Sequence, residues 1–252
     1  MTFTPDSHLV DAVVPSPNHG QRRGMGRPDM IVLHYTGMPD ADAALQWLCH
    51  SDSEVSAHYF IFADGRLVQC VPEARRAWHA GAASWAGETD INSRSIGVEI
   101  ANPGHDLGYP DFANAQIEAV IALCRDLFTR HVIPSDRVLA HSDVAPRRKQ
   151  DPGEKFPWAR LAAAGVGDWI EPAPLASGPT LAMGAEGADV RTLQQRLADY
   201  GYGLAVTGRY DEETQAVVGA FQRHFRPTRV DGMADPSTRE TLAQLLARKV
   251  QA

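Results

Sequence analysis

The segment Met30-Ile31-Val32-Leu33-His34-Tyr35 sets the architecture that we expect of this chain. It is apolar at every position before His34, so a strand formed here would be covered on both faces, as central strands of largely parallel sheets are. Thr36-Gly37 then ends the strand. Ligands of such sheets gather beyond the carboxyl ends of the strands, and His34 lies at that end.

Further strands and helices surround this segment. Residues 57–63 and 66–71 are rich in β-forming residues and flank Asp64-Gly65, a pair typical of a hairpin turn. Residues 95–100 alternate between an apolar face and a polar face that carries Glu99. We expect helices at residues 41–50, 114–132 and 156–164, and a short strand at 138–140. Strands mixed with helices predict an α/β fold, with a mixed central sheet flanked by helices.

The chain is expected to contain two domains. Residues 171–179 are rich in proline and small residues, which is typical of a linker. We therefore expect a first domain at 1–170, a linker at 171–186 and a second domain at 187–252. Asp211 and Asp235-Pro236 are typical helix starts within the last region. The second domain is predicted to be a small three-helix unit.

Composition narrows the class of protein. The 252 residues carry 24 Lys and Arg against 31 Asp and Glu, for a net charge of −7, which argues against a nucleic-acid partner. No segment approaches the roughly 20 apolar residues of a membrane span, and the first residues do not resemble a signal peptide. Three cysteines without a C-x-x-C pair argue against a disulfide framework. We expect a cytoplasmic protein, and the oligomeric state stays undetermined.

Several ligand-type side chains follow predicted strands. His34 and His141 each stand at a strand end, and Asp151 precedes Pro152, which favours an extended backbone. Lys149 then points to the same side as Asp151. Catalytic zinc takes three nitrogen or oxygen ligands and leaves one position open, so this set suits metal-assisted hydrolysis. Glu99 supports it, because a carboxylate on an inward face is costly unless paired or functional. Short patterns of this kind also occur without a metal.

Five motifs together resemble the zinc-dependent N-acetylmuramoyl-L-alanine amidases, which share their fold with peptidoglycan recognition proteins and phage T7 lysozyme. The motifs span about residues 28–169. They are Leu33-His34-Tyr35-Thr36-Gly37, Ser56-Ala57-His58-Tyr59, Ala77-Trp78-His79-Ala80-Gly81, Ser95-Ile96-Gly97-Val98-Glu99-Ile100, and His141-Ser142-Asp143 with Lys149-Gln150-Asp151-Pro152-Gly153.

The resemblance implies a role for each matching residue. It implies that His34, His141 and Asp151 ligate Zn²⁺. It also implies that Glu99 is the catalytic carboxylate and that Lys149 stabilises the transition state. His58, Trp78 and His79 match motifs that line the cleft, which implies substrate contacts. For these last three residues, ordinary packing inside the core is the alternative.

The implied reaction is hydrolysis of the amide between the lactyl group of N-acetylmuramic, or 1,6-anhydro-N-acetylmuramic, acid and L-alanine. The implied partners are peptidoglycan fragments or muropeptides, in cell wall turnover and recycling. Residues 187–249 resemble a three-helix peptidoglycan-binding module, and a helical appendage used for packing or dimerisation is the alternative.

Two other functions remain open at this point. The same fold could bind muropeptides without cutting them, or it could act as a zinc peptidase within the stem peptide. The compartment is open too, because a wall-binding module suggests the periplasm while the free cysteines suggest the cytoplasm. The region around residues 82–94 resembles the broad-specificity members more than the short recycling type, which leaves the preference for the anhydro sugar undecided.

Overall fold

A six-stranded mixed sheet forms the centre of the computed structural model, which describes residues 3–24 and 26–251. Residues 1–2 and 252, at the ends of the two expected domains, lie outside the described part. The sheet has the order β1-β5-β4-β7-β3-β8, in which the β4–β5 hairpin is antiparallel and the other pairs are parallel. Its strands are β1 (Ala12–Val13), β3 (Met30–Tyr35), β4 (Tyr59–Ile61), β5 (Leu67–Gln69), β7 (Ser95–Ile100) and β8 (Val138–Ala140).

The predicted central position of β3 is confirmed. It lies between β7 and β8, and its residues Met30 to Leu33 are completely buried. Ile31 and Leu33 belong to the apolar cluster on the side of α3 (Asn114–Arg130), and Met30 and Val32 belong to a different cluster. The register places His34 directly beside Glu99 of β7, so two candidate site residues meet at one end of the sheet.

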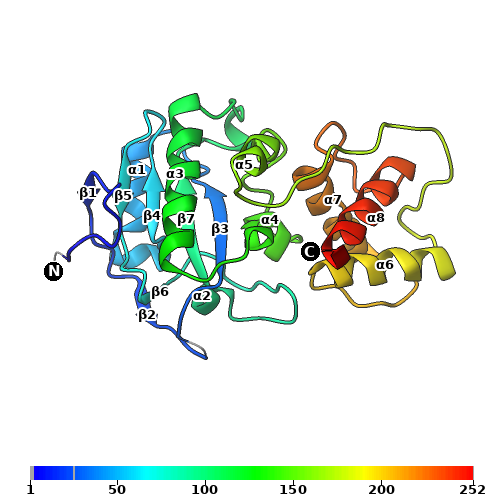
Figure 1. Cartoon of the computed structure of the whole chain (residues 1–252), viewed down its shortest axis with the longest axis horizontal. Helices are drawn as coiled ribbons and strands as arrows, with labels where there is room; N and C mark the ends of the chain where they lie inside the picture. The colour runs from blue at the N-terminus through cyan, green and yellow to red at the C-terminus, as the bar shows by residue number, and fades with distance from the viewer. Residues whose placement is uncertain (1–2, 25, 252) are drawn as a thin grey trace.

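Helices cover the sheet, as Figure 1 shows for α3, which lies across one face. The predicted helix at 114–132 is observed as α3, and the chain leaves the helix at His131, before Pro134. The other helices of the first half are α1 (Ala41–Leu48), α2 (Ile91–Arg94), α4 (His141–Val144) and α5 (Trp158–Ala163). The observed mixed sheet with flanking helices confirms the predicted fold class.

Three helices gather at one end of the molecule, next to α4 and α5 (Figure 1). They are α6 (Ala188–Tyr200), α7 (Glu212–Phe225) and α8 (Pro236–Gln251). The predicted starts hold: Asp211 Oδ1 accepts a hydrogen bond from the Thr214 N–H at 2.9 Å, and Asp235 Oδ1 accepts one from the Thr238 N–H at 2.7 Å. No helix in the described part is long and apolar enough to cross a membrane.

Some elements were not predicted. A two-stranded antiparallel sheet pairs β2 (His19–Gln21) with β6 (Arg75–Ala77), and α2 and α4 are single turns of four residues each. Such short elements depend on contacts from outside the segment, since a lone helical turn is unstable in water. Hydrophobic periodicity, which becomes recognisable over 11 or more residues, therefore does not reveal them.

A buried carboxylate ties the end of α3 to the sheet. Glu73 is 4% exposed, and it accepts hydrogen bonds from the Tyr59 hydroxyl, from Arg130 and from His131. Burial alone would raise the pKa of Glu73, but the hydrogen bonds from His131, Arg130 and Tyr59 outweigh it and lower the pKa from 4.5 to about 2. The ionised form is thus strongly favoured by the folded state.

We expect the stabilising effect of Glu73 to depend on pH. Because its pKa is lower in the folded state, the contribution is complete above the ordinary value of 4.5 and disappears as the pH falls toward about 2. Glu73→Gln should reduce the free energy of unfolding by about 3 kcal/mol at pH 7, and by progressively less below pH 4.5. Urea unfolding of both proteins between pH 7 and pH 3 measures this difference.

Glu118→Gln is the matched control. Glu118 forms an exposed pair with Arg160, and such pairs contribute about 1 kcal/mol or less. A difference between Glu73→Gln and the parent protein that stays constant down to pH 3 would contradict the role assigned to the buried carboxylate.

Candidate active site

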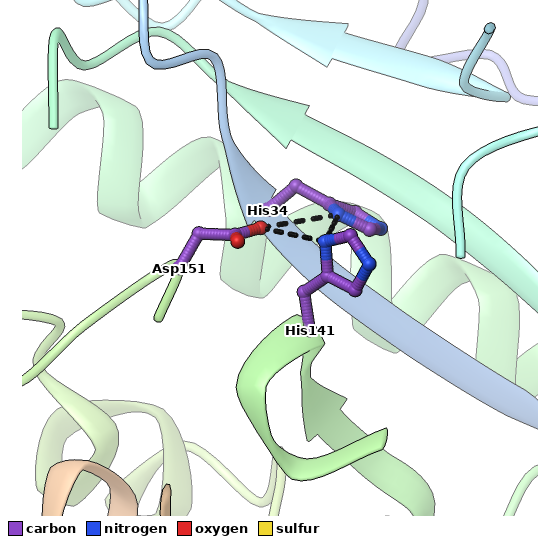
Figure 2. Close-up of side chains that lie close together, drawn as sticks. All are labelled: His34, His141 and Asp151. Atoms are coloured by element: carbon purple, nitrogen blue, oxygen red, sulfur yellow. Dashed lines mark hydrogen bonds and ion pairs between the residues drawn. The ribbon is translucent and has the colours of Figure 1, made fainter. Parts of the chain in front are cut away.

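Three ligand-type atoms from distant segments converge at one point, as Figure 2 shows. The Nδ1 atoms of His34 and His141 are 2.9 Å apart, and Asp151 Oδ2 lies 3.3 Å from the first and 3.0 Å from the second. In the described part of the chain these three residues form a group that could hold a metal ion, with ligand atoms within 4.8 Å of one another. All three side chains are almost completely buried.

The protonation states of His34 and Asp151 suit a metal. Burial, followed by the neighbouring His141, lowers the pKa of His34 to about 4, so its imidazole is neutral at pH 7. Burial alone would raise the pKa of Asp151, but His141 and His34 lower it far below the usual range. Neutral imidazoles and an ionised carboxylate are the forms that bind metals. Two nitrogens and one oxygen also form a donor set typical of catalytic zinc.

The sheet and one short turn position these ligands. His34 is the fifth residue of β3, and β8, the neighbour of β3, runs directly into α4, whose first residue is His141. The Ser142 N–H of this turn donates a hydrogen bond to the Asp151 carbonyl at 3.0 Å. One turn of helix therefore carries one ligand and holds the backbone of another.

The outward ring nitrogens of both histidines are also engaged. His34 Nε2 lies 3.0 Å from His79 Nδ1, and His79 Nε2 lies 3.1 Å from the Ser95 hydroxyl. His141 Nε2 lies 3.2 Å from the Ala80 carbonyl oxygen. Contacts of this kind orient a metal-binding imidazole and set which nitrogen faces the ion. Gly97 leaves room for His79, because a Cβ atom at position 97 would lie 2.4 Å from the His79 ring.

A cavity of about 350 Å³ opens beside the three ligands. Glu99 and Lys149 both line it, together with His34, His141 and Asp151. Burial, reinforced by the charge of Asp151, raises the pKa of Glu99 well above its ordinary value, although Lys149 opposes this. Glu99 Oε2 is buried and has no hydrogen-bond partner in the described part of the chain. A carboxylate left in this state can accept a proton from a molecule in the cavity.

The residues expected to touch substrate occupy different positions. Trp78 and His79 line the cavity, although both nitrogens of His79 are already engaged. His58 is completely buried and is absent from the cavity wall. Its Nδ1 accepts a hydrogen bond from the Gly97 N–H at 2.9 Å, and its Nε2 lies 2.9 Å from Arg22 Nη2. His58 therefore supports the strand beneath the cavity, which differs from the expected substrate contact.

Sequence reasoning missed some residues of the cavity. Trp47 stands at its wall with 49% of its surface exposed, where an aromatic face is free to contact a ligand. A tryptophan on a short helix carries no signal of this role in the sequence. The remaining lining residues are Tyr35, Thr36, Gly37, Met38, Ala44, Leu48, Val55 and Ser56.

Comparisons with known proteins agree with this geometry. Residues 24–154 match the family model described as N-acetylmuramoyl-L-alanine amidase, and residues 186–242 match the putative peptidoglycan binding domain. The chain is 38% identical over 241 residues to the N-acetylmuramoyl-L-alanine amidase AmiD of Escherichia coli, covering 88% of this chain and 83% of that protein. It is 35% identical to the 1,6-anhydro-N-acetylmuramyl-L-alanine amidase AmpD of Enterobacter cloacae, covering 62% of this chain and 90% of that protein.

Solved structures lead to the same family. AmiD from Escherichia coli, in complex with anhydro-N-acetylmuramic acid-L-Ala-D-gamma-Glu-L-Lys, superposes with a TM-score of 0.76 at 36% identity, covering 92% of this chain and 95% of that one. AmpDh3 from Pseudomonas aeruginosa superposes with a TM-score of 0.73 at 30% identity over the whole of both chains. With this sheet, this buried ligand cluster and these matches along its length, the chain belongs to the N-acetylmuramoyl-L-alanine amidase family.

Proposed function

We propose that this protein is a zinc-dependent amidase. It hydrolyses the bond between the lactyl group of N-acetylmuramic, or 1,6-anhydro-N-acetylmuramic, acid and L-alanine. Its substrates are peptidoglycan or muropeptides, in cell wall turnover and recycling. The AmiD structure contains an anhydro-muramyl tripeptide described as its substrate, and a second AmpDh3 structure contains an anhydromuramic pentapeptide. The observation that carries the proposal is the buried His34–His141–Asp151 cluster, which shares one cavity with Glu99, whose Oε2 has no hydrogen-bond partner among the described residues.

Each residue at this cavity has a role in the proposed reaction. His34, His141 and Asp151 would hold the metal. Zinc held there would supply Lewis acidity, which lowers the pKa of water toward about 7 and polarises a carbonyl. Glu99 accepts the proton of the attacking water at Oε2 and returns it to the departing alanine nitrogen. The raised pKa of Glu99 supports this role, because it moves the carboxyl group toward the working pH.

Lys149 and two further residues act on the substrate. Lys149 is exposed at the cavity wall, where its ammonium group stabilises the oxyanion that develops on the carbonyl oxygen. Trp78 presents an aromatic face to the bound sugar or peptide, and His79 contacts the substrate beside the metal while it orients His34. His58 acts through its neighbours, by holding Gly97 in place and packing edge-on against the His79 ring.

We propose that the chain divides into a catalytic domain at 1–170, a linker at 171–186 and a peptidoglycan-binding domain at 187–252. The match of residues 186–242 to a putative peptidoglycan binding domain supports the last of these. A cavity of about 180 Å³ between α6 and α8 is lined by Asp189, Arg196 and Arg239 among others, so hydroxyl-rich glycan would find charged hydrogen-bonding groups there.

We place the protein in the cytoplasm, with the periplasm as the alternative. The free thiols of Cys49, Cys70 and Cys124 support the cytoplasm, where disulfides are rare, and the proposed peptidoglycan-binding domain supports the alternative. Detection of the protein in separated cell fractions decides between the two compartments.

We expect a MurNAc-L-alanyl peptide to be cut into the lactyl sugar and a peptide with a free L-alanine terminus. 1,10-Phenanthroline should abolish the cleavage by removing the metal, and added zinc should restore it. The isomer 1,7-phenanthroline, which does not chelate, is the control. Mass analysis of the products is the measurement. L-alanine left on the sugar would indicate a stem peptidase, and no cleavage at full zinc occupancy would indicate a muropeptide-binding protein.

Glu99→Gln should lower kcat by about 10² to 10⁴, because it removes proton transfer while preserving the shape of the side chain. The Glu99→Gln variant should keep its zinc, as measured by elemental analysis.

Asp151→Ala should instead lose the metal and the activity together. The exposed Glu118→Gln is the control for a simple loss of charge. Near-normal turnover by Glu99→Gln would show that the acid–base role is assigned to the wrong residue.

Binding of the second domain to glycan is tested by sedimentation of the full chain with purified peptidoglycan. Arg196→Gln combined with Arg239→Gln should reduce the bound fraction severalfold, because both side chains line the cavity between α6 and α8. Arg66→Gln, which changes an exposed arginine of the sheet domain, is the matched control. Equal sedimentation of the two variants would place the glycan contact elsewhere.

A further inference from the structure

Asp143 is a completely buried carboxyl group in the turn that carries His141. Three donors surround it. The Ala140 N–H donates to Oδ2 at 2.8 Å, the Tyr202 hydroxyl donates to Oδ1 at 2.7 Å, and His224 Nδ1 donates to Oδ2 at 2.7 Å. Tyr202 and His224 belong to the three-helix region, so two of the three donors come from outside the sheet domain.

Both outside donors are held rigidly. The His224 ring is stacked between Trp158 of α5, at 3.7 Å, and Phe225, at 3.8 Å. Its other nitrogen, Nε2, is buried and has no partner in the described part of the structure, so Asp143 accounts for the polar contact of this ring. The Tyr202 ring is 2% exposed and packs edge-on against Trp85 at 5.0 Å.

The contact lies within a core that both regions share. One apolar cluster includes Val144 and Ala145, at the end of α4, and also Phe221 and Phe225 of α7. The backbone joins the regions too, because the Ala86 N–H donates to the Gly201 carbonyl at 2.7 Å. In this setting the loss of the Tyr202 hydroxyl would leave Oδ1 without its donor, and the loss of His224 would leave Oδ2 with the Ala140 N–H alone.

The turn around Asp143 holds two of the three candidate ligands. α4 has four residues, and a helical turn of this length does not keep its shape without outside support. Asp143 supplies that support by accepting the Ala140 N–H at the start of the turn. Within the same turn, His141 presents Nδ1 to the cluster and the Ser142 N–H holds the Asp151 carbonyl.

We propose that Tyr202 and His224 are positioning residues for the metal centre. By holding Asp143, they fix the turn from which His141 and Asp151 reach the metal. The three-helix region then belongs to the catalytic unit, in addition to any contact that it makes with peptidoglycan. This inference rests on the metal centre assigned above.

The test uses the full chain with Tyr202→Phe combined with His224→Leu, which removes both donors and roughly preserves the packed volume. The zinc Kd should rise about tenfold or more, since partners behind a metal ligand typically contribute 10- to 100-fold to affinity. Competition with a chromophoric chelator measures the Kd. We expect kcat to fall with KM nearly unchanged, because the substrate-contacting side chains stay in place.

Two tyrosines provide matched controls. The Tyr200 hydroxyl bonds to Asp168 at 3.0 Å across the same junction, and the Tyr210 hydroxyl bonds to the Gly232 carbonyl at 2.7 Å within the three-helix region. Tyr200→Phe and Tyr210→Phe each lose one buried hydrogen bond but leave Asp143 untouched, so their zinc Kd should match that of the parent. His224→Asn, whose side-chain amide can reach the position of Nδ1, should restore most of the affinity lost in His224→Leu.

The outcomes separate this inference from the proposed function. A parent protein that neither binds zinc nor cleaves the amide would overturn the proposed function itself. A parent protein that does both, with a double variant whose zinc Kd and kcat lie within twofold of those of Tyr200→Phe, would overturn the positioning role alone. If the double variant does not fold, the single variant Tyr202→Phe takes its place. A zinc Kd and kcat within twofold of those of Tyr200→Phe would then overturn the positioning role.

Discussion

Burial of two imidazoles against one carboxylate is the constraint on which this molecule depends. Inside the protein a charge is costly unless a partner offsets it, so His34 is held neutral while the histidines keep Asp151 ionised. The Nδ1 atoms of the two histidines and Oδ2 of Asp151 then lie between 2.9 and 3.3 Å from one another. This group of atoms could hold a metal ion, and the surrounding elements keep the three side chains in place.

Parallel strand order explains how distant residues meet. β7, β3 and β8 are neighbours that run in one direction, so their carboxyl ends lie together and bring Glu99, His34 and His141 to the same edge. Asp151 then needs only a loop and one backbone hydrogen bond to join them. The hydrogen bonds that Tyr202 and His224 donate to Asp143 connect the same edge to the C-terminal region.

Sequence patterns predicted those parts of the structure that depend on local chemistry. The apolar run of β3, the Asp-Gly hairpin and the amphipathic α3 all appeared where expected, because burial on one or two faces leaves a period in the sequence. The inward position of Glu99 was predictable for the same reason. The complete burial of His58 was not, because a histidine beside a strand can line a cavity or lie beneath its wall, and only the contacts with Arg22 and Gly97 decide which.

The sequence by itself thus determined the mixed sheet with its flanking helices and the residue types of the site. The periodicity of a strand or helix and the identity of a motif are local properties, which can be recognised within one segment. The tertiary structure decided the rest: the convergence of the ligand atoms, the isolation of Glu99 Oε2, and the burial of Asp143 beneath Tyr202 and His224. These features arise from contacts between residues up to 107 positions apart, whose geometry depends on how whole elements pack and leaves no trace in local spacing.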